Sequence, residues 1–458
     1  MPADPPIAAG VSSSASGLPP GPKGLFLVGN AFQLSRDWMG SLTRCARQYG
    51  DVVFFPFLRT PVCLVSRPDL IESILVTGDR NFTKSRDYRA MRRVMGDGLL
   101  TSEGELWKRQ RRLMQPAFHR ERIESYAAIM TGYAERMLAS WKDGEQRDVH
   151  EDMMRLTLEI AAQALFGVEI SRDAQGVGLA VGIFVREFIG MASLAFVLPE
   201  SIPVPGSGKL RRALRRLDEI IYTMIDERRA GADRPGDLLD MLIHAEDEQG
   251  RRMSDRQIRD EAVTLLLAGH ETTALALSWT WLLLARHPEI AARLREELDR
   301  VLGGRAPAPG DLPRLRYAEM VIQESMRLYP PAWGIGRQAI GPFEIGGYRL
   351  PAGTNVLLCQ WIVHRDPRFF PDPERFDPER WRGDPVRSGE LPRFAYFPFG
   401  GGPRVCIGAA FAMMEAVLLL ASIASKFQMA LVPGHAVQML PSITLRPKHG
   451  IRVRLARR

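Results

Sequence analysis

One segment of this chain predicts a single, unusually long helix that is apolar on nearly every face. Residues 254–289 read SDRQIRDEAVTLLLAGHETTALALSWTWLLLARHPE. Ser254 and Gln257 have the spacing of a capping box, which predicts the first turn, and Pro288 disfavours helix in the residue before it. A helix of about 33 residues rises roughly 50 Å, enough to cross a whole domain. Because it lacks a polar face, this helix must be buried.

A membrane-spanning helix is the alternative interpretation of this segment. His270 and Glu271 lie in its middle, and an acidic residue there costs ~3 kcal/mol on insertion scales. The N-terminus has neither a basic start followed by an apolar core nor the roughly 20 apolar residues of an anchor. We therefore expect a soluble, cytoplasmic protein with no signal peptide and no membrane anchor.

The whole chain of 458 residues has 45% apolar and 25% charged residues, which is typical of globular proteins. Residues 1–18 are rich in Ser, Ala and Gly, which predicts a disordered tail. Helical patterns dominate residues 105–330, while residues 51–66 and 335–357 have strand character. No repeat or linker divides residues 19–458, so we expect one mainly α domain with small β-sheets.

Cysteine and charge counts exclude several classes of protein. The chain has four cysteines: Cys45, Cys63, Cys359 and Cys406. They have neither the density of a disulfide scaffold nor the paired spacing of a zinc site. Sixty-one basic and 53 acidic residues leave a net charge of +8. This mild excess hints at an acidic partner but is too weak to indicate nucleic-acid binding.

A polar interruption, AGHETT (residues 268–273), occurs where the long helix should be most apolar. Glycine in a helix interior costs ~1 kcal/mol relative to alanine, so another requirement should favour it. One interpretation is a satisfied polar patch, in which the Thr272 hydroxyl bonds a carbonyl one turn earlier. The other is a local opening that admits a ligand beside an acid and an alcohol. The segment alone favours the first interpretation.

A glycine-rich loop with one cysteine, FPFGGGPRVCIG (residues 397–408), directly precedes an apolar predicted helix. Successive glycines let the backbone turn sharply and approach another group closely. The helix start and the nearby Arg404 both favour a thiolate at Cys406. A lone cysteine is usually a small buried apolar residue, but this setting favours a thiolate ligand or nucleophile. No local pattern supplies the histidine base that a nucleophile needs.

Two spaced pairs of residues complete the candidate motifs. Glu324 and Arg327 in QESMRLYPP lie three apart on a predicted helix, so their side chains are neighbours. A surface ion pair is the simpler interpretation. Trp107 and Arg111 in LWKRQRRL lie four apart, which places an indole donor and a guanidinium on one helix face. An ordinary exposed basic helix is the alternative there.

Taken together and in this order, the motifs resemble those of the cytochrome P450 superfamily of haem-thiolate monooxygenases, over nearly the whole chain. The haem-loop pattern F-x-x-G-x-R-x-C-x-G is matched at every fixed position: Phe399, Gly402, Arg404, Cys406 and Gly408. AGHETT is similar to the oxygen-activation motif, and Trp107 with Arg111 to the propionate-binding helix. ESMR is similar to E-x-x-R, and FDPERW (376–381) supplies Arg380. The resemblance implies that Glu324, Arg327 and Arg380 lock the scaffold behind the cysteine loop.

The resemblance further implies a mainly α cytochrome P450 fold whose long central helix lies over a haem b. The Cys406 thiolate would bind the iron, and the Phe399 ring with the backbone after the cysteine would tune the sulfur. Glu271 and Thr272 would relay protons for oxygen activation, while Gly269 would leave room for oxygen. Four side chains would hold the haem propionates: Trp107, Arg111, Arg337 and Arg404.

The implied reaction hydroxylates or epoxidises an apolar small molecule with one oxygen atom of O2, and the other atom leaves as water. No flavin or iron–sulfur module follows residue 458, so we expect separate electron donors: a ferredoxin or flavodoxin with an NAD(P)H-dependent reductase. Lys108, Arg109 and Arg112 fall largely on the side of their helix away from Trp107. These three cations could dock an acidic carrier; a solvated basic face is an equal alternative.

The segments expected to set the substrate are mostly apolar: residues 81–104, 174–205, 332–336 and 440–444. Their character favours a fatty acid, terpenoid or polyketide-like molecule without choosing among them. Four arginines could attract a carboxylate, although a solvated basic loop is the simpler interpretation: Arg86, Arg89, Arg92 and Arg93. A haem-thiolate sensor or another non-monooxygenase haem protein is the functional alternative, but a sensor needs no acid–alcohol pair.

Overall fold

The computed structural model describes residues 17–24, 29–31, 37–58, 60–167, 169, 174–198, 202–231 and 237–458. The predicted N-terminal tail lies outside the described residues except for its last two positions. Parts of the expected specificity segment 174–205 also lie outside them, and within it the side chains of residues 174–181, 185 and 189 are not described.

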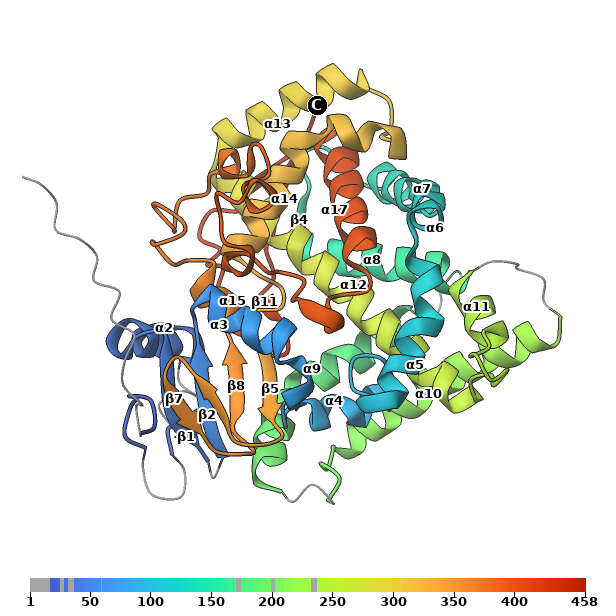
Figure 1. Cartoon of the computed structure of the whole chain (residues 1–458). Helices are drawn as coiled ribbons and strands as arrows, with labels where there is room; N and C mark the ends of the chain where they lie inside the picture. Colours follow the sequence, from blue (N-terminus) through green and yellow to red (C-terminus); the bar gives the residue numbers. More distant parts are fainter. Residues whose placement is uncertain are drawn as a thin grey trace, which may run out of the picture.

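Helices make up most of the molecule, as the sequence predicts (Figure 1). Their bounds are α2 (Trp38–Tyr49), α3 (Pro68–Glu72), α4 (Tyr88–Met95), α5 (Gly104–Met114), α6 (Arg120–Ser125), α7 (Ala127–Ala139), α8 (Val149–Phe166), α9 (Ala174–Val197), α10 (Gly208–Arg229), α11 (Leu238–His244), α12 (Asp255–Arg286), α13 (Pro288–Leu302), α14 (Arg316–Leu328), α15 (Gln360–Val363), α16 (Pro385–Ser388) and α17 (Ala409–Ala424). The expected last helix, after the cysteine loop, is α17.

In the part of the chain that the structure describes, the strands are short and form four small sheets. They are β1 (Val52–Phe57), β2 (Thr60–Val65), β3 (Phe82–Lys84), β4 (Gln146–Asp148), β5 (Ile335–Ala339), β6 (Phe343–Ile345), β7 (Tyr348–Leu350), β8 (Asn355–Leu358), β9 (Phe427–Leu431), β10 (Met439–Pro441), β11 (Leu445–Pro447) and β12 (Arg452–Arg457). The strand pair predicted in residues 51–66 is the hairpin β1–β2. The short strand β4, inside the helical region, is one that the sequence reading missed.

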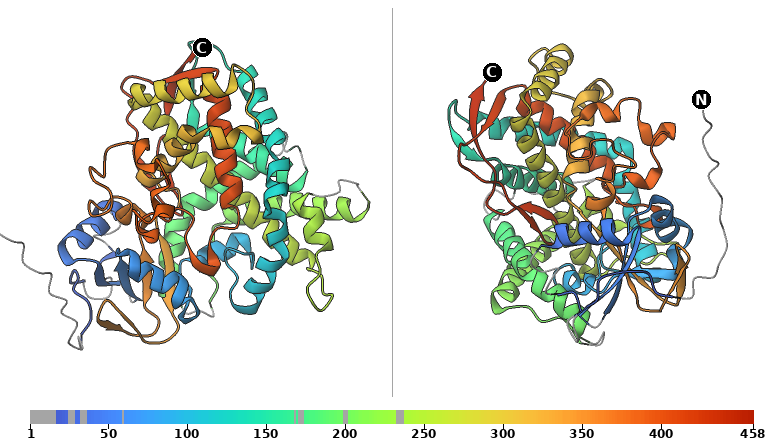
Figure 2. Two further views of the ribbon diagram at one scale, coloured as in Figure 1. Left: turned by 45° about the horizontal axis from the view of Figure 1, so that its top comes forward. Right: turned by 90° about the vertical axis from the view of Figure 1, so that its left-hand side faces the viewer.

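The largest sheet joins distant parts of the chain in the order β1-β2-β8-β5-β3. Strand β2 pairs in parallel with β8, so that Val62 lies opposite Asn355, and the other pairs are antiparallel. This sheet lies at one end of the molecule, and the C-terminal strands β9 and β12 lie on a different side (Figure 2). Strands β5 and β8 bring the 332–358 region alongside the N-terminal hairpin.

Helix α12 begins and ends where the sequence predicts. The Gln257 N–H donates to Ser254 Oγ at 3.3 Å, and the Ser254 N–H donates to Gln257 Oε1 at 3.0 Å, which completes the capping box. The helix ends at Arg286, before the His287–Pro288 dipeptide. It runs through the middle of the molecule (Figure 1), and most of its side chains are buried.

Two hydrophobic cores share helix α12. Its N-terminal half, up to Leu267, packs with α4, α9, α10 and α11. Its C-terminal half, from Ala274, packs with α7, α8, α14 and α17. The segment between these halves is AGHETT, residues 268–273, which belongs to neither core. The polar interruption in the sequence therefore marks the place where the two cores separate.

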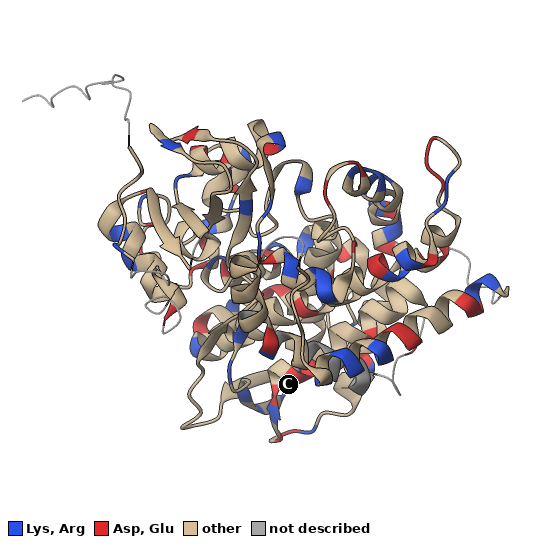
Figure 3. Cartoon of the chain, turned by 90° about the horizontal axis from the view of Figure 1, so that it is seen from below, with Lys and Arg blue, Asp and Glu red and all other residues tan. Residues whose placement is uncertain are grey.

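Charged residues of both signs are interspersed over the helices (Figure 3). Many arginines pair with a nearby carboxylate, as in the bidentate contact of Arg305 with Asp311, where both distances are 2.6 Å. Many of the 61 basic and 53 acidic side chains therefore neutralise each other locally.

Candidate active site

A cavity of about 530 Å³ lies between the AGHETT segment of α12 and the cysteine loop. Helix α9, the loop after α4, strand β5 and the tip of the β10–β11 hairpin complete its walls. The sequence-predicted residues Gly269, Glu271, Thr272, Phe399 and Cys406 all line it. Residues separated by more than a hundred positions in the chain therefore meet at one site.

The cysteine loop is fixed by a close approach of its backbone to a neighbouring segment. Gly402 has a φ of +68°, and a Cβ on it would lie 1.8 Å from the carbonyl oxygen of Leu75. The Cys406 N–H donates to the Phe399 carbonyl at 3.0 Å, which closes the loop. Gly408 is the N-cap residue of α17. This arrangement turns the exposed side of Cys406 toward the cavity.

The electrostatics around the Cys406 sulfur differ from the sequence expectation. Although Cys406 is exposed to the cavity, the protein around it desolvates the thiol and raises its pKa, and the Gly408 N–H and the Arg111 guanidinium offset this only in part. The expected cation, Arg404, instead pairs with Glu103 at 2.7 Å. The Gly408 N–H at the helix start lowers the pKa of the thiol, and the cation that lowers it is Arg111 rather than Arg404, so the thiolate at Cys406 stays a prediction. Because a bound metal ion removes the proton of a coordinating thiol, this sulfur fits a metal ligand.

One end of the cavity gathers the side chains predicted to hold the propionates. The Arg404 guanidinium lies 5.6 Å from the centre of the Trp107 ring, and its Nη1 is buried without a hydrogen-bond partner. Arg337 is buried, its pKa is lowered mainly by that burial, and its Nη1 donates to the Gly336 carbonyl at 3.0 Å. Arg111 Nη1 donates to the Val405 carbonyl at 2.9 Å. Arg404 has Glu103 as its ion-pair partner, whereas Arg111 and Arg337 have no carboxylate partner among the described residues.

Sequence reasoning missed two charged side chains at this end, and no local motif marks either of them. Lys84 Nζ donates to the carbonyls of Leu99 and Ser102, and burial lowers its pKa to about 7. Asp87 accepts a hydrogen bond from the Ser85 hydroxyl, and burial raises its pKa. Both side chains line the cavity.

The AGHETT segment combines both interpretations of its sequence. Thr272 Oγ1 donates to the Ala268 carbonyl at 2.8 Å, one turn earlier, as the satisfied polar patch requires. A Cβ on Gly269 would meet no atom within 4 Å, so glycine is not needed there for protein packing. The open space at Gly269 belongs to the cavity wall. The segment is therefore hydrogen-bonded and also leaves room for a ligand.

Glu271 is held by residues that the sequence did not connect to it. Its Oε1 accepts hydrogen bonds from the Thr444 hydroxyl and from Arg446 Nε, the latter at 2.8 Å. Arg446 Nη2 lies 2.7 Å from the same oxygen. Thr444 is in the predicted 440–444 segment, but nothing in the local sequence marks Arg446 as a partner of α12.

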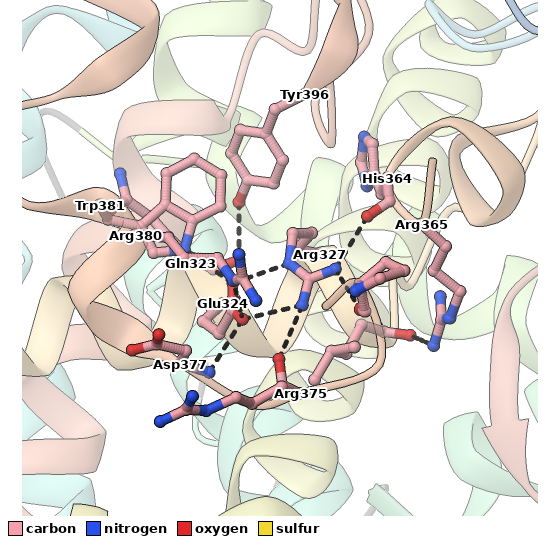
Figure 4. Close-up of polar contacts among 12 residues, drawn as sticks. Gln323, Glu324, Arg327, His364, Arg365, Arg375, Asp377, Arg380, Trp381 and Tyr396 are labelled. Atoms are coloured by element: carbon pink, nitrogen blue, oxygen red, sulfur yellow. Dashed lines mark hydrogen bonds and ion pairs between the residues drawn. The ribbon is translucent and has the colours of Figure 1, made fainter. Parts of the chain in front are cut away.

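Glu324 and Arg327 lie at the centre of a cluster of polar contacts (Figure 4). Both side chains are 0% exposed, so a surface ion pair is the wrong interpretation. Glu324 accepts from Arg327, from the Asp377 N–H and from the Trp381 indole, and Arg380 Nε lies 3.4 Å from its Oε1. Arg327 also donates to the carbonyls of three other residues, at 2.6–3.0 Å: His364, Pro373 and Arg375. The cluster fastens α14 to the irregular segment before the cysteine loop.

The proposed basic docking face does not present three free cations. Arg109 is only 18% exposed, and its guanidinium donates to Asp247 at 2.6 Å and to the carbonyls of Arg251 and Arg252. Lys108 pairs with Glu105 and Arg112 with Glu248. The expectation is wrong for Arg109 because the segment before α12 folds over α5.

The arginines near the cavity mouth also have structural partners. Arg89 donates to the carbonyls of Ala195 and Leu198 at 3.0 Å, where it satisfies the C-terminal end of α9. Arg92 pairs with Asp97. Arg89 is therefore neither a solvated side chain nor a free carboxylate-binding group.

The cavity fits a haem. Its walls supply one thiol, unsatisfied cations that suit two carboxylates, and open space at a helix glycine, all within one mainly apolar enclosure. Of the helices in the described residues, none combines the length and apolarity needed to cross a membrane.

Comparisons with known proteins agree with this fit. The cytochrome P450 family model matches residues 19–453. Cyclooctatin synthase from Streptomyces melanosporofaciens is 40% identical over 93% of this chain and 92% of its own length. Pentalenene oxygenase from Streptomyces avermitilis is 35% identical over 94% of this chain and 96% of its own length. The solved structure of retinoic acid-bound cyanobacterial CYP120A1 superimposes with a TM-score of 0.85 at 28% identity, covering 97% of this chain and all of that one.

The match of the family model, the similarity of these relatives and the shared architecture agree with the thiol-lined cavity. The family uses O2, an apolar substrate and electron-transfer partners, and its haem is bound by a cysteine thiolate. The chain therefore belongs to the cytochrome P450 family and is a haem-thiolate monooxygenase.

Proposed function

We propose that this protein uses haem b to hydroxylate or epoxidise a terpenoid, with electrons from separate redox proteins. One observation carries the proposal: a single mainly apolar cavity contains the Cys406 thiol, the Glu271–Thr272 pair and the cationic end. The relatives named for cyclooctatin and pentalenene, both terpenoids, support the substrate class. The family match across residues 19–453 supports one haem domain from 19 to 458.

The residues around the cavity have distinct roles in holding the cofactor. Cys406 would bind the iron, with the Phe399 ring and the backbone near Gly408 around the sulfur. The propionates would accept hydrogen bonds at the cationic end from Trp107, Arg111, Arg337 and Arg404. Bound haem supplies the iron at which O2 is activated for insertion into a C–H or C=C bond.

Proton delivery would come from the wall formed by α12. The Thr272 hydroxyl can release its bond to the Ala268 carbonyl and donate into the cavity, because rotation about one bond is enough. Glu271, which also lines the cavity, would return the proton to Thr272. The open space at Gly269 would admit O2 beside this pair.

The remaining wall would bind and orient an apolar substrate. Phe184 and Phe188 of α9 contact each other edge to face, with ring centroids 5.9 Å apart, and both line the cavity with Phe196. Leu265 of α12 lies on the same enclosure. Such a wall suits a rigid hydrocarbon, because its burial needs no hydrogen bonds and excludes water from the reacting centre.

The electron donor is proposed to be a ferredoxin or flavodoxin served by an NAD(P)H-dependent reductase. Such carriers are acidic, and Lys108 and Arg112 are exposed cations on α5, which also carries Trp107 of the cationic end. Arg109 is not part of this surface, since it is tied to Asp247. Reduction by an acidic carrier should therefore slow with rising salt through Lys108 and Arg112.

The test is spectroscopic and uses the haem-loaded protein. The reduced protein with carbon monoxide should show the red-shifted band of thiolate-bound haem, and Cys406→Ser should lose it. The matched variant Cys63→Ser, at a buried cysteine in β2, should keep the band. Polycyclic terpene hydrocarbons should then displace the iron-bound water at lower concentration than fatty acids of equal carbon number. Persistence of the band in Cys406→Ser, or preference for fatty acids, would contradict the proposal.

A further inference from the structure

The acid of the AGHETT segment is anchored on one oxygen only. Thr444 and Arg446 both contact Oε1 of Glu271, with Arg446 Nε at 2.8 Å and Nη2 at 2.7 Å. None of the contacts found among the described residues reaches Oε2. Because Glu271 lines the cavity, one carboxylate oxygen is committed to the β10–β11 hairpin and the other is available.

The hairpin that supplies these contacts is held rigidly. The Trp279 indole of α12 donates to the Leu445 carbonyl at 2.9 Å, and the Trp333 indole donates to the Ser442 carbonyl at 2.9 Å. The Leu445 N–H donates to the Pro331 carbonyl at 3.0 Å. Bonds on both sides of Thr444 therefore fix its position, and a group supported in this way can orient a partner within the tolerance that catalysis needs.

The ion pair lies in a desolvated environment. The side chains of Arg446 and Glu271 are 14% and 9% exposed. His150 of α8 faces the pair, its Nδ1 lies 3.2 Å from Ser278 Oγ, and its pKa is lowered to about 4, first by burial and then by Arg446. His270 is also buried, and burial lowers its pKa. Arg446 is thus the cation that compensates Glu271.

Thr444 lines the cavity and also donates its hydroxyl proton to Glu271 in a hydrogen bond. The hairpin tip from Pro441 to Thr444 forms part of the cavity wall. A molecule packed against this tip therefore touches the group that holds the acid.

We propose that Arg446 and Thr444 are positioning residues for Glu271. They hold Oε1 against β11, so that Oε2 is the oxygen that carries the transferred proton, and they link proton delivery to substrate contact at the hairpin tip. This inference rests on the proton-relay role proposed for Glu271. It adds the atom that transfers the proton and the two residues, more than 170 positions away in the chain, that orient it.

The experiment compares three variants with the wild type: Arg446→Gln, Arg446→Lys and Thr444→Val. The first readout is the fraction of electrons that leaves as hydrogen peroxide instead of product. We expect a rise of roughly 10-fold in Arg446→Gln, the scale of losing an outer partner of a reactive group, and a smaller rise in Thr444→Val. Arg446→Lys keeps a cation and a donor, and should restore coupling to near the wild-type value.

The second readout does not depend on turnover. An unpaired buried carboxylate is costly, so Glu271 should carry a proton once Arg446 is replaced by a neutral side chain. Infrared difference spectra of Arg446→Gln against wild type should then contain a carboxylic acid C=O band. The band should be missing in Arg446→Gln/Glu271→Gln. If the ion pair were purely structural, Arg446→Gln would lower the stability of the protein, and Arg446→Lys would not bring peroxide release back to the wild-type value.

Two further variants separate the possible failures. Arg228→Gln breaks another buried ion pair, that with Asp237 at 2.6 Å, and should leave peroxide release unchanged. Suppose that Arg446→Gln and Thr444→Val release no more peroxide than Arg228→Gln, while Glu271→Gln releases more. The positioning role of Arg446 and Thr444 is then wrong, and the relay role of Glu271 stands. If Glu271→Gln itself couples normally, the relay role is wrong. Should Arg446→Gln not fold, Arg446→Lys and Thr444→Val still decide the question.

Discussion

Arg327 donates from Nε and Nη2 to the two carboxylate oxygens of Glu324, each at 2.8 Å, and both side chains are 0% exposed. Trp381 and the Asp377 backbone complete the coordination of the carboxylate. Since this pair joins α14 to the segment that leads into the cysteine loop, its loss should weaken haem binding as well as lower the stability of the fold.

We expect Arg327→Gln to lower the free energy of unfolding by about 3–5 kcal/mol, because it leaves a buried carboxylate uncompensated. Urea unfolding midpoints measure this. The control Arg316→Gln, on the same helix, breaks the ion pair with Glu319, whose side chains are 64% and 34% exposed. It should cost less than about 1 kcal/mol. Equal midpoint shifts for the two variants would contradict the structural role of the cluster.

Gly402→Ala should disturb the cysteine loop more than a comparable change elsewhere. Gly402 and Gly434 both have positive φ, +68° and +80°, but only Gly402 places a Cβ against backbone, 1.8 Å from the Leu75 carbonyl. Gly434→Ala should therefore lower the free energy of unfolding by about 1 kcal/mol, the cost of placing alanine in the left-handed conformation. Gly402→Ala should cost more and should retain less haem per chain. Stability and haem stoichiometry of the two variants give the comparison, and similar values for both would exclude the close approach as the reason for glycine.

Glu415 of α17 should make stability depend on pH. Both of its carboxyl oxygens are buried and lack a hydrogen bond of good geometry, and burial, offset only in part by the nearby Thr273 hydroxyl, raises its pKa to about 8 from a usual 4.5. Between these two values the folded state binds a proton that the unfolded state lacks, so this group's contribution to stability falls as pH rises. Glu415→Gln should match the wild type near pH 5 and exceed its stability at pH 8, measured by urea unfolding. If the wild type instead became more stable than Glu415→Gln toward pH 8, Glu415 would be ionised in the folded protein.

Thr272→Ala should uncouple electron consumption from product formation. The variant should still bind haem and substrate and consume reducing equivalents, while hydrogen peroxide rises and product falls, because proton delivery is impaired. Thr280→Ala is a matched control: it removes the same kind of bond on α12, from Thr280 Oγ1 to the Ala276 carbonyl at 2.7 Å, outside the cavity. Unchanged coupling in Thr272→Ala, or equal uncoupling in both variants, would remove Thr272 from the proposed relay.

Features set by neighbouring residues could be predicted from the sequence. The bounds of α12 follow from Ser254, Gln257 and Pro288, because capping and proline sterics act over a few residues. The glycines of the cysteine loop predict a sharp turn of the backbone, but the segment that Gly402 approaches, at Leu75, is far away in the chain and could not be predicted. The pattern also marked AGHETT as the polar interruption of a buried helix, but the segment alone favoured a satisfied polar patch, and only the family resemblance pointed to an opening there.

Features set by packing between distant segments could not be predicted in this way. A helical wheel places Arg109 opposite Trp107, but only the fold shows that residues 246–252 cover it. In the same way, Glu271 and Arg446 are paired by the arrangement of α12 and β11, and no spacing rule connects positions so far apart. The charge on the Cys406 sulfur depends on desolvation, which the sequence does not reveal.

The parallel pairing of β2 with β8 has a consequence for biosynthesis. Val62 can meet Asn355, and Val65 can meet Leu358, only after most of the chain has left the ribosome. Pairings of such high sequence separation form late, because the entropy of closing a long loop opposes them until other contacts are in place. Because both strands and Cys406 line the same cavity, this cavity is complete only in a nearly full-length polypeptide.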